Sequence, residues 1–297
     1  MSEERSRILK LLEDGKINAD QAARLIQALG AEAVREPPEP PRFSLRRQRR
    51  ILAAELDRIP DIVAEAVSSA VRSGFDRSDS TRTDFPGKNS LFLKSVSGDV
   101  EVSGWDEDRV RLDGLGTMVR VRERDDQVMV RSISGDLSGR VPRESRLELV
   151  SVSGDVKVSG TRGKFTLKSV SGDIVLEDVH GSIGIDSVSG SIVLERVAGS
   201  ISVESKSGDI SLRPVGEFSG EVVSRSGDIK LELGPDADVV LDMECEEEGE
   251  ISVEAGSDHE VLEEAERSMR VKFGKGSRVL RLRTRRADIR VRVAAEE

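Results

Sequence analysis

The stretch SVSGDIVLEDVHGSIGIDSVSGSIVL (residues 169–194) decides the fold, because it contains one eight-residue unit twice, at 169–176 and 187–194. The unit has the form S-x-S-G-D-I-x-L. Further copies are SVSGDVEV (95–102), SISGDLSG (132–139), SVSGDVKV (151–158), SKSGDISL (205–212) and SRSGDIKL (224–231), with EEEGEISV (246–253) and TRRADIRV (284–291) as degenerate copies. Self-similarity at a fixed period of this length is the signature of stacked repeats.

Each repeat predicts two short, half-buried strands joined by a Ser-Gly-Asp corner, since apolar and polar residues alternate on both sides of the glycine. The fold class is therefore mainly β, a β-solenoid of about 18–19-residue rungs with a small α-helical N-terminal region. The gap between Gly98 and Gly135 is close to two periods. It predicts one rung without the motif between residues 100 and 130.

Three columns of aliphatic residues recur at the repeat period and are expected to fill the interior of the solenoid. They are Val156, Ile174, Ile192, Ile210 and Ile229; Val158, Leu176, Leu194, Leu212 and Leu231; and Leu149, Leu167, Ile185, Val203 and Val222. Alternation then predicts that Ser151 and Ser153 point inward and that Val152 points outward.

The outward column predicts a candidate interaction strip about five rungs long. Its members are Val96, Ile133, Val152, Val170 and Val188, and the column continues as Lys206 and Arg225. A contiguous exposed apolar patch is typical of a docking surface. Two alternatives stay open: the segment 45–74 covers the strip, or the corner geometry turns these side chains inward.

The sequence before the repeats predicts helices. Residues 1–30 form a helical hairpin, 31–44 a Pro-rich linker, 45–75 an amphipathic helical segment, 76–90 a linker, and 91–297 the repeat domain. Heptad-like spacing in the third segment gives a candidate oligomer seam: Leu52, Leu56, Ile59, Val63, Ala66 and Ala70. A homo-oligomer through residues 1–75 is one interpretation of this pattern.

The repeats resemble the putative-adhesin β-repeat family, a bacterial domain class of undefined function, over about residues 91–293. RILKLLEDGKINADQAARLIQALG (7–30) is similar to the SHOCT-like helical hairpin that precedes this domain in some members. Together they resemble the YvlB-like and LiaX-like proteins. The resemblance implies a role in the cell-envelope stress of Gram-positive bacteria.

Composition favours a non-enzymatic protein that is located in the cytoplasm. The chain has 297 residues, of which 36% are hydrophobic and 34% charged, with a net charge of −10 and no tyrosine. Cys245 is the only cysteine, and no apolar run resembles a signal peptide or a membrane span. His180 is expected in a solvated turn, and His259 at the start of a helix over 258–270. Convergent catalytic groups are not apparent.

The corner acids Asp99, Asp136, Asp155, Asp173, Asp209 and Asp228 form a carboxylate ladder. Their role as turn formers explains the ladder. Weak cation binding is the alternative, although the extra glycines of calcium-binding repeats are missing. No phosphate-binding loop, zinc spacing or nucleotide fingerprint is present, so no cofactor is expected.

A basic patch, Arg42, Arg46, Arg47, Arg49 and Arg50, precedes the seam. It is a candidate membrane or partner patch, which would place the protein at the inner face of the membrane. A solvated helix face is the alternative, and nucleic acid is not expected because stacking aromatic residues are missing.

These patterns predict a scaffold that acts through protein–protein contacts with a partner that the sequence does not identify. The rivals are a self-assembling structural β-solenoid, a membrane-surface protein acting through residues 42–75, and a carbohydrate-active β-helix. The degenerate last copy and its charged end favour a capped C-terminal end over free stacking.

Overall fold

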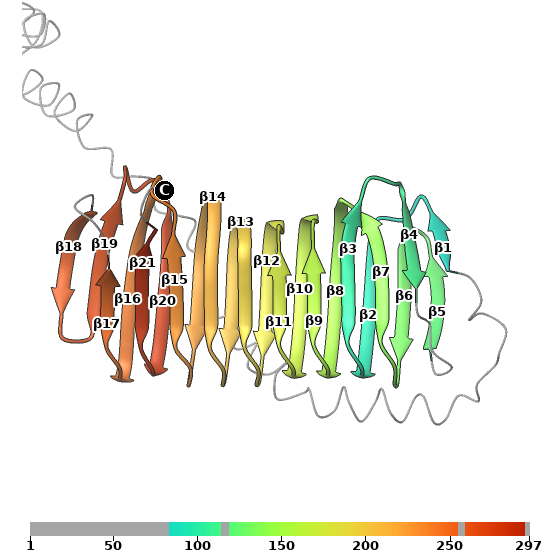
Figure 1. The fold of residues 1–297 in the computed structure, drawn as a ribbon, viewed down its shortest axis with the longest axis horizontal. Helices are drawn as coiled ribbons and strands as arrows, with labels where there is room; N and C mark the ends of the chain where they lie inside the picture. Colours follow the sequence, from blue (N-terminus) through green and yellow to red (C-terminus); the bar gives the residue numbers. More distant parts are fainter. Residues whose placement is uncertain (1–82, 114–118, 255–258, 295–297) are drawn as a thin grey trace, which may run out of the picture. The chain divides into compact units, whose positions relative to one another are not determined.

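The computed structural model describes residues 83–113, 119–254 and 259–294. In these residues the chain winds into rungs of two strands each, and the rungs stack side by side along the long axis (Figure 1). In each rung one strand belongs to a first layer and the next strand to a second layer, with the Ser-Gly-Asp corner between them. The predicted β-solenoid with two strands per repeat is therefore confirmed.

Parallel pairing joins equivalent positions of neighbouring rungs, and antiparallel strands are added at both ends. Along the stack the first layer contains β5 (Val119–Arg124), β6 (Gln127–Ser132), β2 (Ser90–Ser97), β8 (Glu144–Ser153), β10 (Arg162–Ser171), β12 (His180–Ser187), the second halves of β13 (Ile192–Ser205) and β14 (Ile210–Ser224), β20 (Val279–Arg286), β16 (Val239–Glu248), β19 (Ser268–Phe273) and β18 (His259–Ala265).

The strands of the second layer lie in a corresponding order along the stack. It contains β1 (Asp84–Pro86), β4 (Arg109–Asp113), β7 (Leu137–Pro142), β3 (Val100–Trp105), β9 (Val156–Ser159), β11 (Ile174–Glu177), the first halves of β13 and β14, β15 (Ile229–Leu233), β21 (Ile289–Val293) and β17 (Ile251–Glu254).

The core is a run of aliphatic side chains between the two layers. All three predicted columns are buried; Leu167, Leu176 and Ile174, for example, are at most 1% exposed. Each rung covers the apolar face of the next, so the core grows with the stack and needs few aromatic residues. Phe165, packed among leucine and isoleucine, is one of the few large rings that the core contains.

The order of the rungs in space differs from their order in the chain at both ends. At one end β6 and β7 lie outside β2 and β3, which therefore pair with both β6–β7 and β8–β9. At the other end β20 and β21 lie between β14–β15 and β16–β17. The two degenerate copies, 246–253 and 284–291, thus both form rungs of the stack. The copy that comes later in the chain lies nearer the middle of the stack.

Two sequence-based expectations about the ends are wrong. The described residues between 100 and 130 form no separate parallel rung; the long gap between glycines instead holds β4, which pairs antiparallel with β1 and β7, and β5, which pairs antiparallel with β6 at the edge of the stack. Residues 259–265 and 268–273 form the strands β18 and β19 rather than a helix. The open edge of β16 offers backbone partners that an isolated helix of this length would not outweigh.

Four of the predicted elements lie outside the described residues: the hairpin 1–30, the linker 31–44, the segment 45–75 with its seam, and the basic patch. Of the predicted linker 76–90 the structure describes residues 83–90, which contain β1 and the first residue of β2. Within the described residues, no helix has the length and hydropathy that a membrane span requires.

The corner aspartates hold successive rungs together. The Oδ1 atom of Asp155 accepts a hydrogen bond from the backbone N–H of Asp173 at 2.8 Å, and Asp99 accepts one from Asp155 at 2.9 Å. The same bond recurs at the other corners: Asp136–Asp99, Asp173–Ser191, Asp209–Asp228, Asp228–Asp288 and Asp288–Glu250. The aspartate side chains therefore bond between rungs rather than within their own turn, and the series extends to Asp288.

A substitution at Asp155 separates the role of its hydrogen bond from the role of its charge. We expect Asp155→Ala to lower the free energy of unfolding by roughly 1 kcal/mol, because the N–H of Asp173 loses its acceptor. Asp155→Asn keeps an acceptor oxygen and should stay within roughly 0.5 kcal/mol of the wild type. Urea denaturation followed by circular dichroism measures both. Equal losses in the two variants would show that the charge, not the hydrogen bond, matters.

Candidate interaction surface

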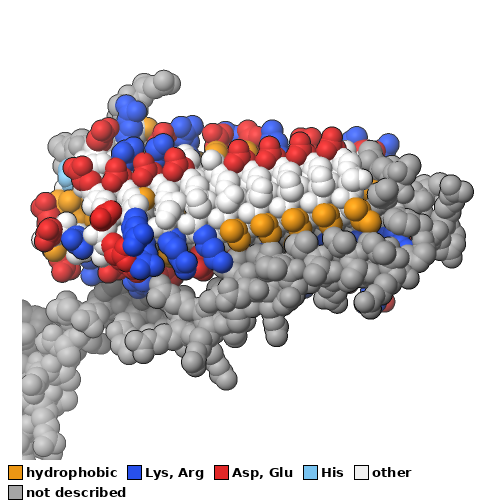
Figure 2. Space-filling view, turned by 90° about the horizontal axis from the view of Figure 1, so that it is seen from below, with side chains coloured by type: hydrophobic (Ala, Val, Ile, Leu, Met, Phe, Trp, Pro, Cys, Tyr) orange, Lys and Arg blue, Asp and Glu red, His pale blue; other side chains and the backbone are white. Residues whose placement is uncertain are grey.

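The predicted interaction strip lies along one corner of the solenoid. Its five aliphatic side chains are half-buried, and they follow the stack in the order Ile133, Val96, Val152, Val170, Val188. With a spacing of about 4.8 Å between strands, the strip is about 19 Å long. Figure 2 shows it as a row of hydrophobic side chains, which basic side chains continue in the same line.

The corner explains why these side chains are half-exposed. The residue before each strip position is a buried serine, such as Ser169 at 1% exposure, whose hydroxyl donates to the carbonyl oxygen of Ser171 at 3.5 Å. The residue after it, such as Ser153 or Ser171, is exposed. The expectation that Ser153 points inward is therefore wrong, because the chain leaves the strand pattern at this point to enter the glycine turn. The strip is the last outward position before the corner.

Charge changes along the same line. Beyond Val188 the column continues as Lys206 and Arg225, and then as Arg285, which is equivalent by register to Arg225. On the other side of the exposed serines runs the aspartate ladder, seen in Figure 2 as a parallel row of acidic side chains. The corner thus combines an apolar line with a basic end and an acidic border.

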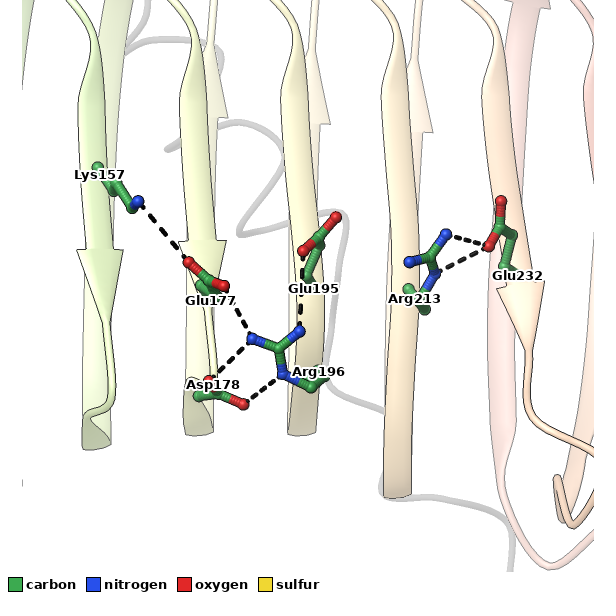
Figure 3. A network of polar contacts seen from close by, with 7 residues as sticks. All are labelled: Lys157, Glu177, Asp178, Glu195, Arg196, Arg213 and Glu232. Atoms are coloured by element: carbon green, nitrogen blue, oxygen red, sulfur yellow. Dashed lines mark hydrogen bonds and ion pairs between the residues drawn. The ribbon is translucent and has the colours of Figure 1, made fainter.

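The outer face of the second layer differs from the strip, because ion pairs between charged side chains connect its neighbouring rungs (Figure 3). Arg196 donates to Asp178 through Nε at 2.7 Å and Nη2 at 2.9 Å, and to Glu177 at 2.8 Å. Arg213 pairs with Glu232 through Nε at 2.8 Å. The hydrogen bonds from Arg196 hold the pKa of Asp178 below its ordinary value, and they raise that of Arg196. The outer face of the second layer thus carries paired charges, whereas the strip is a row of aliphatic side chains.

The residues that could carry chemistry are dispersed. His180 begins β12, and His259 begins β18, where its ring stacks on Phe273 at 5.9 Å between centroids. His259 therefore lies in a strand and not at a helix start. No group of three or more His, Cys, Asp or Glu residues in the described parts of the chain is arranged to hold a metal ion.

Cys245 takes the place of a serine in the buried serine column. It pairs in register with Thr284, which itself pairs with Ser224, and the hydroxyl of Thr284 lies 3.4 Å from Sγ. Burial raises the pKa of the Cys245 thiol. This position needs a small side chain with a weakly polar atom, and the cysteine meets that need.

Sequence reasoning missed the charged contacts around the inserted strand β20. Arg283 lies 3.3 Å from Glu221 of β14 and 3.2 Å from Glu244 of β16. Further along, Arg285 and Arg286 both contact Glu247, and these hydrogen bonds lower the pKa of that carboxyl. The signal was present in the acidic stretch 242–250 and the basic stretch 281–286, which are complementary in charge.

The comparison with protein families decides where the chain belongs. The family model described as Toastrack DUF4097 matches residues 81–263. The chain belongs to the Toastrack DUF4097 family. A second family model, for a SHOCT-like domain, matches residues 3–33, so the suspected pairing of the two modules is confirmed. The Toastrack match ends within β18, although β20 and β21 complete the stack.

The chain is also similar to solved structures. One is described as a "putative cell adhesion protein" from Clostridium sporogenes, with 11% identity, a TM-score of 0.26, and coverage of 70% of this chain and 94% of that one. Another is a "putative adhesin" from Bacteroides fragilis, with 11% identity, a TM-score of 0.41, and coverage of 71% and 95%. No curated protein matches the chain.

Proposed function

We propose that this Toastrack protein is a non-enzymatic interaction scaffold in the bacterial response to cell-envelope stress, with the strip as its contact surface. The observation that supports the proposal is the line from Ile133 to Val188, an aliphatic row that continues as Lys206 and Arg225. A contiguous apolar row that is partly open to solvent is typical of a contact surface. The stress role rests on the resemblance of the two-module chain to envelope-stress proteins.

The chemistry of the row indicates the kind of partner. An amphipathic helix presents apolar side chains at i, i+3, i+4 and i+7, so its stripe advances by about 5.4 Å per turn, close to the rung spacing. Such a helix, with about four apolar turns followed by acidic residues, would match the strip and its basic end. We therefore propose a protein partner that contributes an acidic amphipathic helix.

The fold itself supplies variants that test the strip without disturbing the stack. Because Lys206 occupies the same column as Val188, the variant Val170→Lys/Val188→Lys should fold normally. On the second layer, Val175 and Val193 are likewise half-exposed, and Lys157 lies beside Val175 in register. Val175→Lys/Val193→Lys is therefore a matched control.

In the bacterium that carries the gene, we expect deletion to change survival in antibiotics that attack the envelope. The wild-type gene and the second-layer control should restore survival, whereas the strip variant should not, at equal protein levels. Deletion without an envelope phenotype would refute the stress role. Restoration by the strip variant would refute the strip as the contact surface while leaving the stress role in place.

A further inference from the structure

The two ends of the stack are open edges of the first layer. β5 pairs only with β6, and β18 pairs only with β19, so among the described strands nothing bonds to their outer edges. An open edge presents unpaired N–H and C=O groups that can bond to another chain. The two strands are similar in length, at 6 and 7 residues.

β18 carries two exposed apolar side chains. Val261 is 47% exposed and Leu262 is 45% exposed; Leu262 is the extra residue of a β-bulge between Val261 and Glu263, so only Val261 lies in the regular pairing with β19. Val261 pairs in register with the buried Val271, which places it on the side that faces the core. On β5 the side that faces the core carries Val119 and Val121. If β5 of another copy lay beside β18, the apolar sides of the two strands would be continuous.

The charges of the two edges are opposite. The sequence of β5 is VRVRER, with arginines at 120, 122 and 124 and one acid, Glu123, which pairs with Lys88 at 3.2 Å. That of β18 is HEVLEEA, with glutamates at 260, 263 and 264. Glu260 already pairs with Lys272 at 3.1 Å, which leaves Glu263 and Glu264 as the acids of the edge. Like edges repel each other and unlike edges attract, so the charges favour contact of one end with the opposite end.

Strand direction also fits. β5 runs antiparallel to β6, and β19 and β18 alternate in direction beyond β16, which is parallel to β20 and hence to the other first-layer strands. In a second copy stacked in the same orientation, β5 would therefore be antiparallel to β18 of the first. The alternation β16, β19, β18, β5, β6 would continue without a break across the junction.

We propose that copies of this chain assemble head to tail, with the basic edge strand β5 of one copy pairing antiparallel with the acidic edge strand β18 of the next. A contact between two different surfaces of one chain does not close on itself as a twofold contact does, so it gives chains of copies. The contact is separate from the strip, and neither proposal depends on the other.

Charge reversal of the full chain tests this assembly. One variant is Glu263→Arg/Glu264→Arg, and the other is Arg122→Glu/Arg124→Glu. We expect the wild-type mass, measured by light scattering at low salt, to rise continuously with concentration, and each variant to lose that rise. An equimolar mixture of the two variants should regain it, because each reversed end then meets a complementary one.

Two outcomes would overturn the proposal. The first is a wild-type mass that does not change with concentration, including a fixed oligomer held by residues 1–82, which the reversals would leave intact. The second is a concentration-dependent mass that both variants retain. High salt should weaken the wild-type assembly, because it screens exposed charges. The single substitution Val261→Lys gives a separate check, since it should reduce assembly without reversing an acidic side chain.

Discussion

Replacing Gly172 with alanine is expected to lower the free energy of unfolding by about 3–5 kcal/mol. Gly172 has a φ of +117°, a conformation that side chains with a Cβ rarely adopt. A Cβ built there would also lie 2.2 Å from the carbonyl oxygen of Gly154 in the neighbouring rung. Relief of this clash would separate the two rungs where the aspartate ladder joins them. Urea denaturation followed by circular dichroism measures the loss.

Gly135 provides the matched control, because it has the same turn but no rung on one side. Its φ is +100°, and a Cβ there would meet nothing within 4 Å. Gly135→Ala should therefore cost only the backbone strain, about 1–2 kcal/mol. Equal costs at Gly135 and Gly172 would contradict the view that close stacking, rather than turn geometry alone, requires the glycine column.

Much of the repeat architecture could be predicted from the sequence because it depends on local pattern. The inward columns follow from alternation within one repeat, and the period places equivalent residues above one another. The strip from Val96 to Val188 also follows from this rule. Alternation fails at Ser153, the last residue of β8, because the chain bends there toward the glycine turn and the side chain is exposed.

The order of the rungs could not be predicted in this way. Every rung presents nearly the same inward residues, so Val222 could accept either Met243 or Leu282 as a neighbour. The choice depends on contacts between residues far apart in the chain, such as Arg283 between Glu221 and Glu244. Such contacts appear in the sequence only as separate acidic and basic stretches.

The edge strands illustrate the same limit. Residues 258–270 have spacing that suits a helix, but β16 offers an unpaired backbone edge to the strand β19. The pairing of β18 with β19, and the exposure of Val261 that results, depend on this tertiary contact. The candidate assembly surface was therefore not visible from the sequence, although its charges were.

Leu282→Ala is expected to lower the free energy of unfolding by about 3 kcal/mol, as for a buried leucine in the middle of the stack. Leu282 is fully buried although it lies near the end of the chain, because its strand β20 lies between β14 and β16. Leu212→Ala, also fully buried, is the reference for a central rung. Urea denaturation of both variants gives the comparison.

A double-mutant cycle between Leu282 and Val222 tests the insertion directly. The two residues pair in register, so we expect Val222→Ala and Leu282→Ala to be coupled by roughly 0.5–3 kcal/mol. If the rungs followed chain order, β16 would separate these two residues and the coupling would be near zero. Leu282 would then lie in the outermost rung, and its loss would cost much less than that of Leu212. A large, coupled effect therefore requires that the last repeat of the chain fills an inner position of the stack.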